Sequence, residues 1–206
     1  MTAAPVTRTP RPAAREEGRL NLPNALTLGR LVAVPVLAVL LLAVELSTGS
    51  RLLAWAVFTI ACVTDVVDGR LARAWGQVTR FGVMADPIAD KALVGTALIG
   101  LSLLGQVPWW ATAVVLGREV GVTLVRLAVL RHGLIPASRG GKLKALSQNV
   151  AVAAYLLPLG AALGTVRLPL LLLAVVCTVL TGLDYAARAV RIRRDALARA
   201  AAPPAD

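Results

Sequence analysis

Four aspartates in one short stretch of the chain are the residues best suited to chemistry. They lie in Asp65-Val-Val-Asp68 and in Asp86-Pro-Ile-Ala-Asp90. Helical residues three or four apart share a face, so each segment presents two carboxylates side by side. Each ionised Asp near the centre of a membrane helix costs roughly 2.5–3.5 kcal/mol, so the four need a positive partner. Carboxylate oxygens suit hard divalent cations, and two such ions favour phosphoryl transfer.

Two simpler explanations of these acids are charges at helix ends and partners for nearby arginines. Either explains one or two of the aspartates. Neither explains four of them with Gly69 and Gly82 between them. We therefore expect a site for two divalent cations, Mg²⁺ or Mn²⁺.

The spacing around the acids resembles the signature of the CDP-alcohol phosphotransferase family. The pattern D-x2-D-G-x2-A-R-x8-G-x3-D-x3-D begins at Asp65, and every specified position matches. The resemblance implies that Asp65, Asp68 and Asp86 bind the metal ions. It implies that Asp90 is the general base for the incoming hydroxyl and also contacts a metal ion. The residues implied to bind the CDP-linked lipid are Gly69, Ala72, Arg73, Thr79 and Gly82; for Gly69 and Ala72, close helix packing is the alternative.

Outside this signature, Asn21 to Arg188 resemble the phosphatidylglycerophosphate synthases. The matching pieces are Asn21–Arg30, Asp86–Lys91, Arg118-Glu119, Ser138–Lys144 and Asp184-Tyr185. The resemblance implies transfer of a phosphatidyl group from CDP-diacylglycerol to sn-glycerol 3-phosphate, with release of CMP. Asn24, Thr27 and Arg30 are then expected to bind the CDP-lipid. The alternatives are a helix cap for Asn24 and an acidic partner for Arg30.

An acceptor that carries a phosphate needs cations of its own. The candidates are Arg118, Arg139, Lys142 and Lys144. Arg118 lies in an apolar segment beside Glu119, where an unpaired charge is costly. An ion pair with Glu119 is the alternative for Arg118, and a purely topological role is the alternative for the other three.

Composition identifies a membrane protein. The 206 residues are 57% hydrophobic with a net charge of +11, and the mean hydropathy is +0.74. We expect an all-α integral membrane domain at residues 20–195, a disordered cytoplasmic tail at 1–19 and a second tail at 196–206. Cys62 and Cys177 are interpreted as small buried hydrophobes. No cleaved signal peptide is expected.

Six transmembrane helices fit the hydropathy pattern, after a short interfacial segment at Leu20–Asn24. Pro35 and Pro158 would lie inside spans. The expected spans are Ala25–Glu45, Leu52–Arg73, Phe81–Leu104, Pro108–Leu130, Lys142–Leu159 and Leu168–Arg188.

Charged residues in the connections predict the orientation. Arginines and lysines gather in alternate connections, around Arg70–Arg80, Arg131–Lys144 and Arg188–Arg194, while the opposite side offers only Glu45, Arg51 and Arg167. By the positive-inside rule, both termini are cytoplasmic in a multi-pass protein of the cell inner (plasma) membrane. The acids then lie at the cytoplasmic edge, where a nucleotide-linked substrate can reach them.

Other functions fit the sequence less well. A sister enzyme with phosphatidylglycerol (a cardiolipin synthase) or inositol phosphate as acceptor is the nearest alternative. A cation transporter predicts acids near the bilayer midplane and internal repeats, and the sequence has neither. Nucleic-acid binding is not expected, because the basic residues are spread over membrane-flanking loops without an aromatic stacking surface. A homodimer is expected from the family, with the small residues Gly95, Ala97, Gly100, Gly121 and Ala128 as candidates for close helix contact.

Overall fold

The computed structural model of the chain describes most of its apolar part. The backbone is described for residues 22–42, 47–74, 80–129, 139–158, 160 and 164–201. Side chains are described for residues 25–42, 47–67, 85–126, 140–158, 160 and 164–194.

The described residues form six helices and no strand, which confirms the all-α prediction. They are α1 (Leu22–Leu42), α2 (Thr48–Ala74), α3 (Arg80–Leu103), α4 (Trp109–Val129), α5 (Arg139–Leu156) and α7 (Arg167–Ala201). The turn between α3 and α4 uses Gly105, whose φ of 68° suits a residue without a side chain.

Several boundaries differ from the predictions. Helix α2 begins at Thr48 and not at Leu52, and α5 begins at Arg139 and not at Lys142. The last helix continues past Arg188 to Ala201, because hydropathy marks only the apolar part of a helix whose Ala- and Arg-rich end also favours helix. The fifth helix, expected at Lys142–Leu159, ends at Leu156, since the residue before a proline disfavours the helical conformation. Pro158 therefore lies after α5 and not inside a span. The described part of the expected interfacial segment, Leu22–Asn24, is the first turn of α1.

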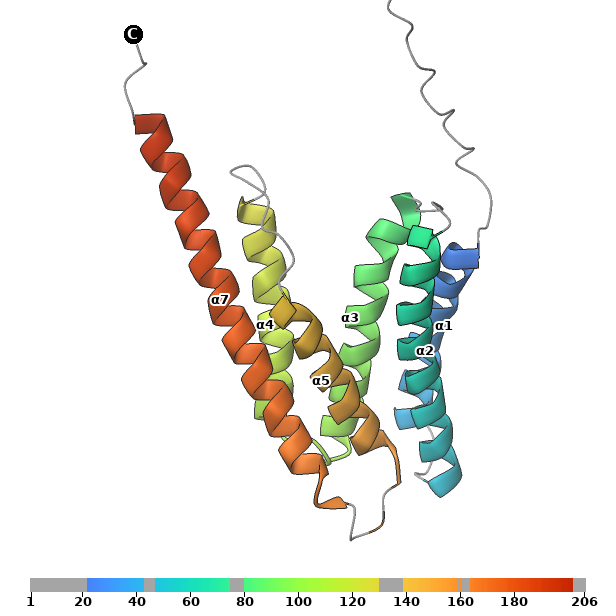
Figure 1. The fold of residues 1–206 in the computed structure, drawn as a ribbon. Coiled ribbons are helices and arrows are strands. Elements are labelled where there is room, and N and C mark those ends of the chain that lie inside the picture. Colours follow the sequence, from blue (N-terminus) through green and yellow to red (C-terminus); the bar gives the residue numbers. More distant parts are fainter. Residues whose placement is uncertain are drawn as a thin grey trace, which may run out of the picture.

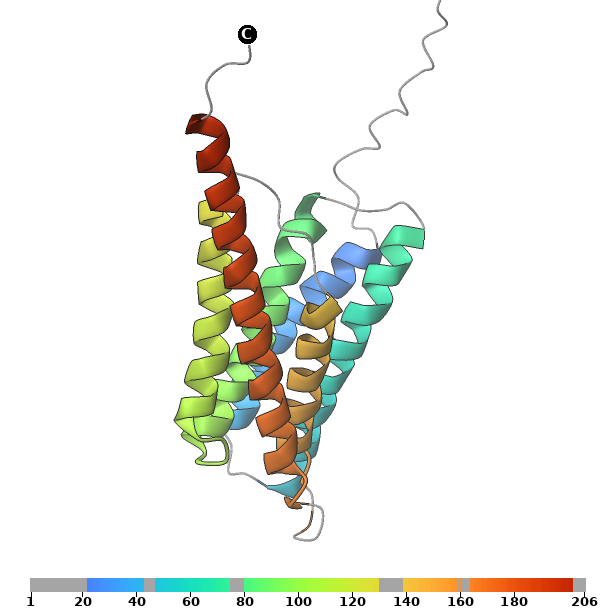
Figure 2. The same ribbon diagram turned by 60° about the vertical axis from the view of Figure 1, so that its left-hand side comes forward.

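The helices form two groups of three (Figures 1 and 2). In the first group α1 packs against α2 and α3, and in the second α7 packs against α4 and α5. Helix α5 also contacts α2 and α3, which joins the groups. The end of α2 and the beginnings of α1 and α3 lie at the same end of the bundle as the C-terminal end of α7 (Figure 1). This arrangement brings the two aspartate-bearing segments together.

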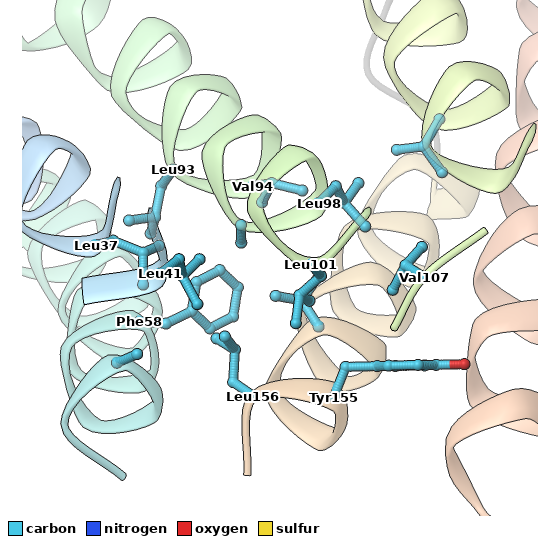
Figure 3. Close-up of a cluster of buried hydrophobic side chains, with 14 of the residues drawn as sticks. Leu37, Leu41, Phe58, Leu93, Val94, Leu98, Leu101, Val107, Tyr155 and Leu156 are labelled. Atoms are coloured by element: carbon cyan, nitrogen blue, oxygen red, sulfur yellow. The ribbon is translucent and has the colours of Figure 1, made fainter. Parts of the chain in front are cut away.

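The apolar core begins within one turn of the acids, at Leu93 of α3, and continues toward the other end of the bundle (Figure 3). Phe58, Leu93, Leu101 and Leu156 are at most 2% exposed and come from α2, α3 and α5 (Figure 3). Burial of this size anchors the helix ends opposite the site.

Three of the small residues considered for a dimer face are used inside the protomer. Ala97 is fully buried. A Cβ at Gly100 would lie 2.7 Å from Leu41 Cδ1 of α1, and one at Gly95 would lie 3.5 Å from Leu116 of α4. These residues let α3 approach its neighbours closely. Gly121 has open space around it, and Ala128 lies outside the described side chains.

Three helices are long and apolar enough to cross a membrane. Their apolar stretches are Ala25–Leu42, Thr48–Val67 and Arg167–Arg194 within the described residues. Helices α3, α4 and α5 instead have charged residues along their apolar stretches, among them Asp90, Glu119 and Lys144.

Candidate active site

The first cluster of the site joins the acids of α2 and α3 to a cation of α1. Arg30 Nη1 lies 2.5 Å from Asp65 Oδ1 and 4.0 Å from Asp86 Oδ1. The Thr27 hydroxyl donates a hydrogen bond to Asp86 Oδ1 at 2.6 Å. One turn of α1 thus supplies both a guanidinium and a hydroxyl to the two carboxylates. We call these four residues the acidic cluster.

Burial differs sharply within this cluster. The side chain of Arg30 is fully buried, while about two fifths of the Asp65 and Asp86 side chains are exposed, 40% and 41%. The sequence left open whether Arg30 faces a diphosphate or an acidic partner, and in this structure it faces acids. The carboxylates keep a solvent-facing side on which further ligands have room.

Asp90 lies on α3 one turn after Asp86 and is half-buried. The charges of Asp65, Lys144, Arg30 and Glu119 all act on its carboxyl group. Helix α3 packs against α1, α4 and α5, so Asp90 lies on the helix that joins the acidic cluster to the helices of Glu119 and Lys144. That is a suitable place for a base that must reach a hydroxyl between two bound substrates.

The acids of this site differ in how well they match the expected metal ions. Among the described side chains, no three His, Cys, Asp or Glu residues are arranged to hold a metal ion. Asp68, the fourth predicted ligand, has a side chain outside that set. The chemistry of the donors nevertheless fits, since Asp65 and Asp86 offer carboxylate oxygens of the kind that Mg²⁺ and Mn²⁺ prefer. A cation, Arg30, already lies between these two carboxylates.

The second cluster is built on Glu119 of α4. Arg118 Nη1 donates to Glu119 Oε1 at 3.0 Å, and Lys144 Nζ of α5 contacts the same oxygen. All three side chains are mostly buried. The structure thus joins two of the four predicted acceptor cations, and the ion pair considered for Arg118 is present. We call these three residues the Glu119 triad.

Helix α7 holds Arg118 in place from the other side. Arg118 Nη2 donates to the Thr181 hydroxyl at 3.2 Å. A Cβ at Gly182 would lie 3.1 Å from Arg118 Cγ, so the glycine makes room for the side chain. Lys142, in contrast, is exposed and makes no ion pair with another described residue. Its predicted role stays a prediction.

Sequence reasoning did not assign Glu119 or Lys91 to the site. Glu119 was considered only as a partner for Arg118, yet the charges of Lys144, Arg118 and Lys91 all act on it. Lys91 Nζ donates to Thr123 Oγ1 of α4 at 2.5 Å. The available signal was the charge itself, because a charged residue inside an apolar helix requires a partner.

Asp184 and Tyr185 of α7 each contact an arginine. Arg188 forms a two-fold contact with Asp184, at 3.1 Å and 3.0 Å. The Tyr185 hydroxyl accepts a hydrogen bond from Arg126 Nε at 3.4 Å.

Several predicted site residues lie outside the residues whose side chains are described. Asn24 is in α1, Gly82 is in α3, and Arg139 is the first residue of α5. Those in the last turns of α2 are Asp68, Gly69, Ala72 and Arg73. Thr79 lies outside the described backbone as well.

The chain is similar to known proteins that act on CDP-linked lipids. A model of the CDP-alcohol phosphatidyltransferase family matches residues 20–180. A Mycobacterium tuberculosis protein named probable phosphatidylglycerophosphate synthase is 53% identical over 175 residues, 83% of this chain and 82% of that protein.

Two other relatives are more distant. A CDP-diacylglycerol–glycerol-3-phosphate 3-phosphatidyltransferase of Bacillus subtilis is 39% identical over 148 residues, 66% of this chain and 77% of that protein. A CMP-forming cardiolipin synthase of Streptomyces coelicolor is 38% identical over 120 residues, 57% of this chain and 55% of that protein. Because the family match covers most of the chain, including both clusters, the chain belongs to the CDP-alcohol phosphatidyltransferase family.

Proposed function

We propose that the protein is a CDP-diacylglycerol–glycerol-3-phosphate 3-phosphatidyltransferase. The observation that carries the proposal is that α3, which bears Asp86 and Asp90, packs against α1 of the acidic cluster and against α4 and α5 of the Glu119 triad. One side offers carboxylates for a diphosphate with its cations, and the other offers Arg118 and Lys144 for a phosphate on the acceptor. The names of the relatives from M. tuberculosis and B. subtilis support this activity.

In the proposed reaction, the acceptor hydroxyl attacks the phosphorus atom that carries the diacylglycerol. Asp90 takes the hydroxyl proton as the new P–O bond forms. The bond from that phosphorus to the oxygen of CMP breaks, and CMP leaves with the electron pair of that bond. Divalent cations held by Asp65, Asp68, Asp86 and Asp90 would neutralise phosphate oxygens during this transfer.

The two groups of cations have separate tasks in this proposal. Arg30, with Asn24, Thr27, Gly69, Ala72, Arg73, Thr79 and Gly82, is assigned to the CDP-lipid. Arg118, Arg139, Lys142 and Lys144 are assigned to the acceptor phosphate, which a guanidinium can bind with two parallel hydrogen bonds.

We also propose that all six helices cross the plasma membrane with both termini in the cytoplasm. Three helices have the required length and hydropathy, and the other three carry charges that pair inside the bundle. The positive residues of alternate connections support this orientation. A homodimer is part of the proposal by family resemblance alone.

A cardiolipin synthase is the second candidate, because the S. coelicolor relative carries that name. Its acceptor is a lipid and needs no pocket for a soluble phosphate. The acceptor therefore separates the two candidates.

The test is CMP release by the purified protein with CDP-diacylglycerol and Mg²⁺ or Mn²⁺, with only the acceptor varied. Release that depends on sn-glycerol 3-phosphate is expected. Charge reversal at Arg139 and Lys142 should raise the KM for that acceptor, while Arg191→Glu, on the exposed surface of α7, serves as the control. Release that depends on phosphatidylglycerol, or reversal variants with unchanged turnover, would overturn the acceptor assignment.

A further inference from the structure

One oxygen of Glu119 is the meeting point of two cations from different helices. Arg118 belongs to α4 and Lys144 to α5, and both contact Glu119 Oε1. Because the two cations share one oxygen, they are held close enough together for the oxygens of a single phosphate to reach both. A carboxylate therefore occupies the place where the proposed function needs an acceptor phosphate.

Further contacts around Glu119 also place positive charge near its carboxylate. Its backbone carbonyl accepts a hydrogen bond from Thr123 Oγ1 at 2.8 Å, and Thr123 in turn accepts one from Lys91. The charges of Lys144, Arg118 and Lys91 act on the Glu119 carboxylate itself. Even with Asp90, whose charge also acts on Lys144, the three cations outnumber the two carboxylates, and this excess of positive charge suits an external anion.

The triad also has donors beyond those that Glu119 uses. An ammonium group has three N–H donors and a guanidinium has five. Lys144 uses one in the described contact with Glu119, and Arg118 uses one on Glu119 and one on Thr181. A phosphate can therefore bind these cations while the carboxylate still competes for them.

We propose that Glu119 is a positioning residue that sets the affinity of the site for the acceptor phosphate. It holds Arg118 and Lys144 at the spacing of a phosphate when the acceptor is absent, and it competes with the phosphate when the acceptor is present. The proposal rests on the proposed function, because that function supplies the phosphorylated acceptor.

The competition has a consequence for turnover. The phosphate of glycerol 3-phosphate is not consumed in the transfer, so the product carries it on the same cations. Because the Glu119 carboxylate competes for these cations, it weakens the complex with the product as well as the complex with the substrate. Removing its charge should therefore lower the KM for the acceptor and, because product leaves more slowly, lower kcat too.

The first experiment compares the wild type with Glu119→Gln in CMP release over a series of sn-glycerol 3-phosphate concentrations. Glutamine keeps an oxygen that accepts from both cations but removes the charge. We expect the acceptor KM to fall about five- to tenfold, as expected for loss of one competing charge near the phosphate, with a lower kcat. An ion pair with only a structural role predicts a lower kcat and an unchanged or higher KM, and that result would overturn the proposal.

A control variant removes another carboxylate that is paired with an arginine. Asp184→Asn breaks the exposed pair with Arg188 on α7 and should leave both kinetic constants unchanged. Glu119→Ala removes both the charge and the shared acceptor, so the two cations separate and the acceptor KM should rise.

A second experiment does not depend on catalysis. Inorganic phosphate should raise the melting temperature of Glu119→Gln more than that of the wild type, because it binds more tightly to the folded variant. If the wild type shows no release of CMP that depends on glycerol phosphate, the proposed function fails, while this measurement still tests the role of Glu119. Equal shifts in the two proteins would overturn the proposal.

The double variant Glu119→Gln/Lys144→Met guards against misfolding of the single variant. It removes one charge of each sign, so it leaves no additional uncompensated charge in the protein. Phosphate should bind it at least about threefold more tightly than it binds Lys144→Met alone, since Glu119 still competes in the latter. Equal phosphate affinities would contradict the competition.

Discussion

Arg30 gives the sharpest test of the acidic cluster. Replacing it by methionine keeps much of the side-chain volume and removes the charge between Asp65 and Asp86. Removing one partner of a buried ion pair costs about 3–5 kcal/mol. Arg30 is fully buried, but about two fifths of each carboxylate side chain is exposed. Water can therefore solvate the carboxylates in part, and we expect the lower end of that range, about 3 kcal/mol.

The assay is thermal unfolding of the purified protein in EDTA. For a chain of this size, 1 kcal/mol corresponds to about 2–4 °C, so Arg30→Met should melt roughly 6–12 °C below the wild type. Mg²⁺ should recover part of the loss, because a divalent cation can replace the missing positive charge between the carboxylates. Arg126→Met is the matched control, since Arg126 is exposed and makes one long hydrogen bond to Tyr185.

Two outcomes would refute this reasoning. An Arg30→Met protein that melts within about 2 °C of the wild type in EDTA would show that Arg30 does not stabilise the acids. A loss as large in Arg126→Met would show that the effect is general to arginines of the bundle.

Two further predictions concern catalysis and packing. Asp90→Asn should retain part of the metal binding but lose transfer by at least about 100-fold, because no carboxylate remains to take the hydroxyl proton; CMP release measures this, and a rate like that of the wild type would remove Asp90 from the mechanism. Gly100→Ala should destabilise the protein by about 1–3 kcal/mol, since the new Cβ would lie 2.7 Å from Leu41 Cδ1 and 3.1 Å from Leu41 Cβ. Gly117→Ala, in α4 with nothing within 4 Å of its Cβ, should raise the melting temperature slightly through helix propensity; a similar change in both variants would contradict the close packing of α3 on α1.

The sequence alone predicted the helical class, the approximate helix positions and the family. Hydropathy located the six helices because each contains a largely apolar segment, although charged residues interrupt those of α3, α4 and α5. It misplaced the ends of α5 and α7, since helix boundaries depend on a following proline or on propensity outside the apolar stretch. The aspartates were recognised because their spacing is local, and a local spacing is present in the sequence itself.

Tertiary structure decided which charges meet. Arg30 is 35 residues before Asp65 along the chain, and only the packing of α1 against α2 and α3 places its guanidinium between Asp65 and Asp86. Lys144 reaches Glu119 only because α4 and α5 both pack against α7 and α3. The physical reason is that a charge in an apolar helix requires a partner, but the sequence does not say which one. Several pairings of acids and cations in the sequence would satisfy that requirement, and helix packing determines which of these pairs form.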